Sequence, residues 1–255
     1  MRVITINLNG IRSACKKGFF AWLRRQNADI VCLQELRAHE DQIQDKSFWP
    51  RSFHCFYHSA QKKGYSGVGI FCRKEPKYVI KGLGLKAFDI EGRWIEARYE
   101  HLSVVSLYLP SGSYDKNRQS LKMDILEKLY FYFEHLKESG RQYIICGDFN
   151  IAHKKIDIKN WKGNKKSPGF LPEERAWMDK LVDESNWVDA FREKNLKEDQ
   201  FTWWSNRGNS WENNVGWRID YQLITSQLAK KLNQVKIYKG KRFSDHSPLI
   251  IDYYD

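Results

Sequence analysis

The sequence predicts an α/β protein in which β-sheets pack as a sandwich and helices flank them. Strand-like apolar runs are more numerous than helix-like segments, and they do not alternate with helices in the regular order of a doubly wound sheet. The 255 residues contain no Pro/Gly/Ser-rich linker and no abrupt change in composition. We therefore expect one domain over residues 1–255, long enough to bury a large core.

The strands are predicted from short apolar runs that occur along the whole chain. Residues 3–8 alternate like a strand, and residues 30–33 and 143–146 are continuous apolar runs. Further strand-like runs cover residues 67–72, 78–80, 93–99, 102–109, 220–225, 234–238 and 249–253. Because these runs dominate the chain, we expect the core to be formed mainly by sheets.

Three helices are predicted between the strands. Residues 18–26 read as a short amphipathic helix with Phe19, Trp22 and Leu23 on one side. Residues 120–138 form the second, ended by Ser139-Gly140, with these apolar residues at helical spacing: Leu121, Ile125, Leu129, Tyr132 and Leu136. Residues 172–185 form the third, with Pro172 near its start and acidic residues in its first turn.

The chain is strongly basic. It has 43 Lys and Arg against 31 Asp and Glu, a net charge of +12. Such an excess favours polyanionic partners, nucleic acid first and acidic membrane surfaces second. No apolar stretch approaches the roughly 20 residues of a membrane helix, and a strand beginning at Met1 leaves no room for a signal peptide. We therefore expect a cytoplasmic protein with no membrane partner.

The five cysteines agree with a reducing compartment. Their number is odd and no Cys-x-x-Cys motif occurs, which argues against a disulfide framework and a thiolate zinc site. His54 and His58 are four residues apart, but the residues between them look extended, so we do not predict a metal pair there.

Polar side chains follow the ends of several predicted strands. Asn7, Glu35, Tyr108, Asp148 and Asn150 each come at or after an apolar run, and Asp220 and the pair Asp245-His246 occupy similar positions near the C-terminus. Ligands gather at strand ends and in the loops beyond them. This set of oxygens and one imidazole suits a hard divalent cation and acid–base chemistry on a phosphate ester.

If the reaction is hydrolysis of a phosphodiester, each of these residues has a candidate role. Glu35 is the best metal ligand, and Asp148 is the candidate that orients or deprotonates water. Asn150 can hold that water or a phosphoryl oxygen without adding charge, and Tyr108 is a candidate donor to the phosphate. A carboxylate beside His246 would fix its tautomer and raise its pKa. Spacing alone does not decide whether Asp220 is that carboxylate.

Two further segments have the composition of a DNA contact. Residues 153–166 contain six lysines and one acid, interleaved with Gly, Asn and Trp161. Seven of the ten tryptophans lie between Trp161 and Trp217. Aromatic residues beside a charged site can stack on bases or enclose an extruded nucleotide. We assign Trp177 and Trp187 to the core instead.

Together these motifs resemble one family, the exonuclease III-type apurinic/apyrimidinic (AP) endonucleases of the endonuclease/exonuclease/phosphatase superfamily. The stretches that carry the resemblance occur in family order over almost the whole chain: residues 7–12, 33–35, 64–68, 106–112, 146–153, 161–164, 169–175, 215–221 and 243–248. The resemblance implies a four-layer α/β sandwich, with two mixed β-sheets packed face to face and helices on both outer faces. It also implies an enzyme dependent on Mg²⁺ or Mn²⁺.

The implied activity is DNA repair. Such an enzyme cleaves duplex DNA on the 5′ side of an abasic site, and 3′–5′ exonuclease and 3′-phosphatase activities vary among members of the family. Carried over residue by residue, the catalytic set is Tyr108, Asp148, Asn150, Asp220, Asp245 and His246. The implied metal environment is Asn7, Glu35, Asp148, Asn150, Asp245 and His246.

The resemblance also implies the contacts to DNA. Backbone contacts fall on Arg12, Ser111, Asn164, Lys165 and Lys166, and the walls of the abasic pocket fall on Trp203, Trp217 and Ile219. Two positions depart from the pattern, since some members carry an acid where this chain has Asn9 and an Asn where it has Ser111. We expect a monomer.

Two alternatives remain open from the sequence. One is a phosphoesterase of the same superfamily acting on inositol phosphates or sphingomyelin, which would not need the basic loop or the tryptophans. The other is a non-catalytic DNA-binding module, in which acids at the binding face would oppose DNA unless a cation neutralised them.

Overall fold

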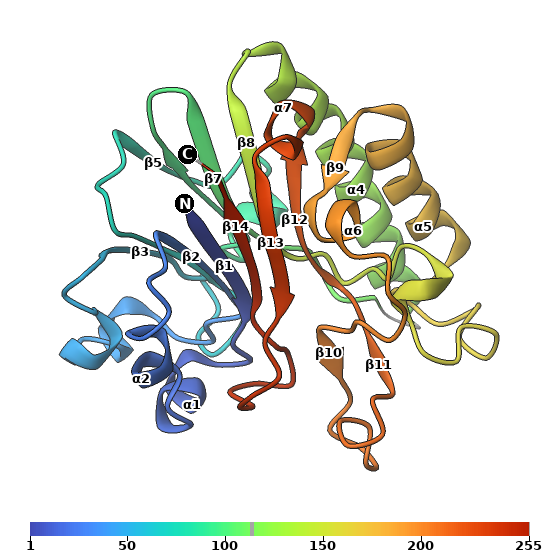
Figure 1. The fold of residues 1–255 in the computed structure, drawn as a ribbon, viewed down its shortest axis with the longest axis horizontal. Helices are drawn as coiled ribbons and strands as arrows, with labels where there is room; N and C mark the ends of the chain where they lie inside the picture. The colour runs from blue at the N-terminus through green and yellow to red at the C-terminus, as the bar shows by residue number, and fades with distance from the viewer. Residues whose placement is uncertain (113–114, 255) are drawn as a thin grey trace.

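Two six-stranded sheets pack face to face in the computed structural model, which describes residues 1–112 and 115–254. Helices cover the outer side of each sheet (Figure 1). The two ends of the chain lie side by side, because the first strand pairs with the last and the Met1 ammonium donates to the Tyr253 carbonyl at 2.7 Å.

The first sheet has the strand order β13-β14-β1-β2-β4-β3. Its strands are β1 (Arg2–Asn7), β2 (Ile30–Gln34), β3 (His54–His58), β4 (Val68–Cys72), β13 (Leu232–Ile237) and β14 (Leu249–Tyr253). The central pair, β1 and β2, is parallel, and the other pairs are antiparallel. The two parallel strands therefore end at the same edge of the sheet.

The second sheet repeats this plan with the order β5-β6-β7-β8-β12-β9. Its strands are β5 (Tyr78–Lys81), β6 (Trp94–Arg98), β7 (Leu102–Tyr108), β8 (Gln142–Asp148), β9 (Trp187–Asp189) and β12 (Asp220–Thr225). Here β7 and β8 form the parallel pair. A short ribbon, β10 (Trp203–Trp204) with β11 (Gly216–Trp217), projects beyond the sheets (Figure 1).

Helices complete the outer layers. Against the first sheet lie α1 (Ile11–Lys16) and α2 (Phe19–Leu23), and against the second lie α4 (Lys116–Glu138) and α5 (Pro172–Asp179) (Figure 1). Shorter elements are α3 (Lys86–Asp89), α6 (Ala190–Lys194), α7 (Ser226–Ala229) and the single turns η1 (Glu40–Gln42), η2 (Lys46–Phe48), η3 (Lys155–Asp157) and η4 (Lys180–Glu184). Among the described residues, no helix is long and apolar enough to cross a membrane.

Three apolar clusters hold these layers together. The central one lies between the sheets and contains Cys32, Ile70, Val104, Cys146 and Ile251, all fully buried. The other two lie between each sheet and its helices. Trp177 and Trp187 belong to the cluster under α4 and α5, as predicted. The four-layer α/β sandwich is thus confirmed, and all five cysteines are free thiols.

Several predicted helices differ in their limits. The helix expected over residues 18–26 is confined to α2, which starts after Gly18 in the left-handed region at φ 88°. The preceding α1 was not predicted, since only Ile11 and Ala14 of its six residues are buried. The third helix continues past α5 as the π-helical turn η4, so its expected span is nearly correct.

The long helix α4 corrects the predicted apolar face. It begins four residues earlier than expected, where the Asp115 carboxylate accepts from the backbone N–H groups of Asn117 at 2.9 Å and Arg118 at 3.2 Å. Leu121, predicted to face the core, is 49% exposed, and its neighbour Lys122 is fully buried. Helical spacing could not predict this exchange, because Lys122 is buried as the ion-pair partner of Glu174 on α5.

Gly147 explains how Asp148 reaches its position. At φ 154°, a Cβ on this residue would lie 1.8 Å from the Leu107 carbonyl oxygen of the neighbouring strand β7. Only glycine lets β8 run this close to β7 immediately before the carboxylate. The approach places Asp148 beside Tyr108, its partner in the parallel register.

Candidate active site

The carboxyl ends of the two parallel strand pairs meet at one cavity of about 540 Å³. It is lined by Asn7, Asn9, Glu35, Arg37, Tyr108, Ser111, Gly112, Asp148, Asn150, Asn164, Ser167, Pro168, Gly169, Trp203, Trp217, Ile219, Asp245 and His246. Residues more than 230 positions apart in the sequence, Asn7 and His246, therefore share one site. The ribbon β10–β11 stands at the same end of the molecule (Figure 1).

Asn7 links the two central carboxylates. Its side-chain N–H group donates to Glu35 Oε2 at 3.0 Å and to Asp148 Oδ2 at 2.8 Å. The amide oxygen accepts from the backbone N–H of Asn9 at 2.9 Å, which fixes the amide's orientation. A neutral amide thus holds two acids together, one from each sheet, without adding charge.

Asp148 is a buried carboxylate with a perturbed pKa. Burial, with a smaller contribution from the nearby Asp220, raises its pKa to about 7 against the lowering effects of the charge of His246 and the hydrogen bonds from Asn7 and Asn150. Asn150 donates its backbone N–H to Oδ1 at 2.8 Å and its side-chain amide to Oδ2 at 3.2 Å. Asn150 is itself anchored, with φ 51° and a bond from its side-chain amide to the Leu109 carbonyl at 3.0 Å.

His246 is paired with Asp220. Its Nδ1 lies 2.9 Å from Asp220 Oδ2, and its Nε2 points toward Asp148 Oδ2 at 3.9 Å. Burial lowers the pKa of this imidazole. The carboxylates of Asp220, Asp148 and Asp245 outweigh burial and raise the pKa to about 10. The second oxygen of Asp220, Oδ1, is buried and has no hydrogen-bond partner among the described residues. The cavity therefore presents an imidazolium N–H beside a carboxylate.

Tyr108 stands on the opposite side as a neutral donor. Burial raises the pKa of its hydroxyl well above the ordinary value, and the nearby charges of Glu35 and Asp148 act in the same direction. The Arg93 guanidinium lies 4.6 Å from the ring centroid and donates to the Tyr108 carbonyl at 3.0 Å. This contact fixes the ring at the edge of the cavity.

Two more acids of the cavity have cationic or neutral partners. Glu35, at φ 55°, forms an ion pair with Arg37, whose Nε donates to Oε1 at 2.8 Å. Asp245 accepts from Asn9 at 2.8 Å and from the indole N–H of Trp203 at 3.1 Å. Burial raises the pKa of Asp245, but the charge of His246 and the hydrogen bonds from Asn9, Trp203 and Ser244 lower it below its usual value.

An apolar wall closes one side. Trp203 and Trp217 meet edge to face with centroids 6.1 Å apart, and Ile219 beside them is 6% exposed. All three pack with a small cluster containing Ile158 and Phe170. This wall is formed by residues of the ribbon and of the segment leading into β12, packed against Ile158 and Phe170.

An ion-pair network fixes the segment that carries this wall. Arg218, fully buried, contacts Asp157 at 2.8 Å and Asp189 at 2.7 Å, and Arg192 contacts Asp157 at 2.7 Å. Burial would raise the pKa of Asp157, but the two arginines lower it to about 2. The network joins the basic loop, β9 and the start of β12 on either side of Trp217 and Ile219.

The family model described as the Endonuclease/Exonuclease/phosphatase family matches residues 4–246. The chain belongs to the Endonuclease/Exonuclease/phosphatase family. The site residues from Asn7 to His246 all fall within the matched region.

Named proteins resemble this chain over nearly all of its length. It is 35% identical over 251 residues to the exodeoxyribonuclease of Bacillus subtilis (strain 168), with 98% of each chain covered. It is 36% identical over 256 residues to DNA repair nuclease APEX1 of Danio rerio, covering 98% of this chain and 81% of that protein. The solved structure of an AP endonuclease from Archaeoglobus fulgidus superposes with a TM-score of 0.91, at 27% identity and 99% coverage of both chains.

Most of the predicted site residues line the cavity of this family member. Asp220 lies behind it, against His246. Three predicted DNA contacts lie outside it: Arg12 borders a neighbouring basic hollow with Lys16 and Arg37, and Lys165 and Lys166 are exposed just beyond Asn164. Sequence reasoning missed Arg37 and the turn Ser167–Pro168–Gly169, although a basic residue two positions after Glu35 was a usable signal.

The donor set fits a hard divalent cation. Carboxylate and amide oxygens face the cavity and no thiol does. Asp148, Asp220 and His246 form one buried group whose ligand atoms all lie within 4.8 Å of one another. Asp220 Oδ1 is buried without a hydrogen-bond partner among the described residues, and burial raises the pKa of Asp148. Both are expected of buried carboxylates that lack a neutralising cation. His246, held as an imidazolium, is better suited to contact an anion than a metal.

Proposed function

We propose that this protein is a DNA repair nuclease that hydrolyses the phosphodiester 5′ to abasic sites in duplex DNA. The observation that carries the proposal is the pairing of acids across the cavity: Asp148 is joined to Glu35 through Asn7 and faces the His246–Asp220 pair. The names of the relatives support the same reaction class, since they describe an exodeoxyribonuclease, a DNA repair nuclease and an AP endonuclease.

The chain's own residues supply most of the chemistry. Asp148, with a pKa near 7, orients and deprotonates the attacking water. The imidazolium of His246 donates to a phosphoryl oxygen, and Asp220 keeps it charged. Tyr108 and Asn150 donate to the remaining oxygens of the scissile phosphate. Asp245, held by Asn9 and Trp203, assists on the leaving-group side.

Glu35, Asn7 and Asp148 would hold a Mg²⁺ or Mn²⁺ ion, with Asn150 and Asp245 as further oxygen donors. When bound, the ion supplies Lewis-acid stabilisation of the phosphoryl charge. Arg37 pairs with Glu35 and so holds this carboxylate in place at the cavity.

The apolar wall of Trp203, Trp217 and Ile219 recognises the abasic site. A deoxyribose without its base fits against Trp203, Trp217 and Ile219, where a nucleotide carrying a base would meet the two indole rings. Ser111 and Asn164 line the cavity as phosphate contacts, and Arg12, Lys165 and Lys166 extend the basic surface around it. The same hydrolysis at a 3′ end would give exonuclease or phosphatase activity.

We also propose that the protein acts as a monomer in the cytoplasm. The five free thiols are those expected in a reducing compartment. The single domain over residues 1–255 stays a prediction, supported by a site that draws on both ends of the chain.

A nicking assay tests the proposed function. A labelled duplex carrying one stable abasic analogue is incubated with Mg²⁺, with Mn²⁺ or with EDTA, beside the undamaged duplex. We expect incision 5′ to the lesion with either ion, none in EDTA, and slower degradation of the undamaged control. Digestion from 3′ ends without lesion preference would make the protein an exonuclease, and no cleavage of DNA by the folded protein would favour a phosphoesterase with another substrate or a binding module.

A further inference from the structure

The ribbon β10–β11 carries two of the three residues of the apolar wall, Trp203 and Trp217. They are partners in its antiparallel register, and both line the catalytic cavity. Each strand of the ribbon has only two residues. Because an isolated two-stranded hairpin is marginally stable even with longer strands, the ribbon needs support from the rest of the molecule to hold the two indole rings in place.

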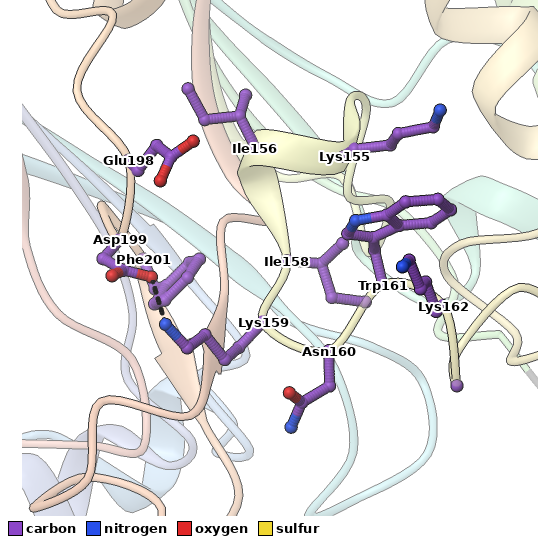
Figure 2. A pocket seen from close by; sticks show the side chains of 11 residues that line it. Lys155, Ile156, Ile158, Lys159, Asn160, Trp161, Lys162, Glu198, Asp199 and Phe201 are labelled. Carbon is purple, nitrogen blue, oxygen red and sulfur yellow. Dashed lines mark hydrogen bonds and ion pairs between the residues drawn. The ribbon is translucent and has the colours of Figure 1, made fainter.

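Part of this support comes from the basic loop, residues 153–166. Ile158 forms an antiparallel bridge with Trp217, and the backbone N–H of Lys159 donates to the Gly216 carbonyl at 2.9 Å. Figure 2 shows the Lys159 ammonium directed at the Asp199 carboxylate, 2.9 Å away. This ion pair joins the basic loop to the segment that leads into β10. These contacts therefore hold the ribbon on the β11 side.

The back of the ribbon is covered by a second tryptophan and by cations. Successive side chains of a strand point to opposite faces, so Trp204 lies on the face of β10 that is turned away from the cavity. Trp204 is 1% exposed, and the ring of Trp211 meets it edge to face with centroids 4.4 Å apart. Its indole N–H donates to Asn214 Oδ1 at 3.1 Å, and the Lys239 ammonium lies 5.2 Å from its ring centroid.

Arg242, on the connection between β13 and β14, joins the back of the ribbon to the active site. Its Nη2 donates to Asn206 Oδ1 at 2.9 Å and to the Trp204 carbonyl at 3.4 Å. Its Nε donates to the Ser244 carbonyl at 3.2 Å, and its guanidinium carbon lies 5.2 Å from the centroid of the Trp211 ring. One planar guanidinium therefore bonds to both the ribbon and the segment that enters the active site.

The position of β10 affects the cavity, because the ribbon and this segment share several bonds. The backbone N–H of Trp204 donates to the Asp245 carbonyl at 3.1 Å, and Trp203 forms an isolated antiparallel bridge with His246. The indole N–H of Trp203 also donates to the Asp245 carboxylate at 3.1 Å. A shift of the ribbon on loss of Arg242 would therefore move the Trp203 ring and change the width of the cavity at the apolar wall.

We infer that Arg242, packed against Trp211, is a positioning residue that sets the preference of the site for an abasic deoxyribose. It acts from behind the ribbon, through Trp203, rather than by contact with the substrate. The inference rests on the proposed function, because it requires that the apolar wall recognises the lesion. It adds the group that keeps this wall in place, which the sequence reasoning did not single out.

The test compares variants of the full chain that alter either the guanidinium or the ring. Arg242→Met removes the guanidinium, and Arg242→Lys keeps the charge but lacks the planar fork that bonds to both segments. Trp211→Leu removes the ring, and Trp211→Phe keeps an aromatic face. Lys241→Met is the matched control, because it removes the same charge from an exposed neighbour. Thermal unfolding first shows that each variant is folded.

Two measurements separate positioning from binding of phosphates. Binding to an abasic duplex and to the undamaged duplex is followed by anisotropy in EDTA at several salt concentrations, and kcat/KM for abasic incision is measured in Mg²⁺. For Arg242→Met and Trp211→Leu we expect kcat/KM to fall about ten- to a hundredfold, because misplacement by about an ångström has effects of this size. Binding to the undamaged duplex should stay within about threefold with an unchanged salt slope, because phosphate contacts carry it.

The preference for the abasic duplex in binding should fall in both single variants. Arg242→Lys should resemble Arg242→Met, whereas Trp211→Phe and Lys241→Met should resemble the unsubstituted protein. The double variant Arg242→Met with Trp211→Leu should lose no more than the more affected single variant, since residues that act as one unit are not additive.

Three results would overturn the inference. They are an abasic preference that both single variants keep, additive losses in the double variant, and a salt slope reduced by about one in Arg242→Met but not in Trp211→Leu, which would make Arg242 a phosphate contact. An unsubstituted protein that bound and cleaved the abasic and undamaged duplexes alike would overturn the proposed function together with this inference. If the unsubstituted protein has the preference and the variants retain it, only this inference fails.

Discussion

At the scale of single residues, neighbouring carboxylates acquire different properties from their surroundings. Asp148 is buried with a pKa raised to about 7, whereas the pKa of Asp245, in the same cavity, is lowered by the charge of His246 and by three hydrogen-bond donors. The Asp220 carboxylate pairs with Nδ1 of His246 at 2.9 Å. A pair of acids with pKa values pushed apart is a common basis for dividing the work of a hydrolase.

The Asp220–His246 pair gives a pH-dependent prediction. In the intact protein the pKa of His246 is raised to about 10, so the imidazolium persists throughout the neutral range. Asp220→Asn removes the largest raising influence, so burial, which lowers the pKa, is then opposed only by Asp148 and Asp245. The variant should lose activity as pH rises through this lowered pKa, at pH values where the unsubstituted protein stays active. A kcat/KM profile from about pH 5.5 to 9.5 measures this.

The same kcat/KM profile can also contradict this prediction. If the two profiles differ only by a constant factor, then Asp220 does not set the charge of His246. A circular dichroism spectrum of the folded variant at each pH excludes loss of structure as the cause.

The sequence predicted the site residues for a physical reason. Polar groups at the ends of buried strands are costly to bury without a purpose, so Asn7, Glu35, Asp148 and Asp220 stood out. The partner of His246 could not be chosen from spacing, because Asp220 and Asp245 both precede it in the chain. Only the antiparallel register that places Asp220 opposite Asp148 decides it.

At the scale of elements, the buried ion pair between α4 and α5 supports the catalytic turn. Lys122 contacts Glu174 at 2.7 Å and donates to the Asn150 carbonyl at 3.0 Å. The other oxygen of Glu174 accepts from the backbone N–H groups of Gly169 at 2.6 Å and Leu171 at 3.1 Å. One pair thus fixes both Asn150, two positions after Asp148, and the end of the basic loop.

Removing the Lys122 ammonium should leave the Glu174 carboxylate buried without a cationic partner. We expect Lys122→Met to lower the free energy of unfolding by about 3–5 kcal/mol. Adding Glu174→Gln to Lys122→Met should recover part of this loss, because the carboxylate charge is then absent. Urea unfolding at pH 7 measures the three proteins. The neighbouring exposed Leu121→Ala is the control, with an expected change within about 0.5 kcal/mol, and an equally small change for Lys122→Met would refute the account.

This element also shows where sequence reasoning ends. Apolar spacing predicted a helix over most of α4, but it placed Leu121 inward and did not single out Lys122. The burial of a lysine depends on an acid 52 residues away. No local pattern contains that information, and the same holds for Arg218, which is buried between Asp157 and Asp189.

At the scale of the whole molecule, the two-sheet plan brings the ends of four strands, β1, β2, β7 and β8, to one cavity in a chain with a net charge of +12. The comparisons confirm the predicted family, the α/β fold and a DNA repair nuclease. The fold was predictable because most of its strands are apolar runs of four residues or more. The ribbon β10–β11 was not, because each strand has only two residues.

The basic loop gives a prediction at this scale. Lys165→Ala with Lys166→Ala should weaken binding of duplex DNA and lower its salt slope by about two, since each lysine releases about one counterion on contact with phosphate. Anisotropy titrations at several salt concentrations measure the slope, with Lys230→Ala and Lys231→Ala as the control. An unchanged slope would remove these two lysines from the interface.

The most direct test of the central claim uses Asp148→Asn and one abasic duplex. Single-turnover incision in Mg²⁺ and equilibrium binding in EDTA are measured on the same substrate, after circular dichroism has shown an intact fold. We expect incision to fall by at least about a thousandfold, because the base for the attacking water is lost, while binding stays within about threefold because the DNA contacts remain. Incision at an undiminished rate, or loss of binding together with incision, would contradict Asp148 as the catalytic group of this nuclease.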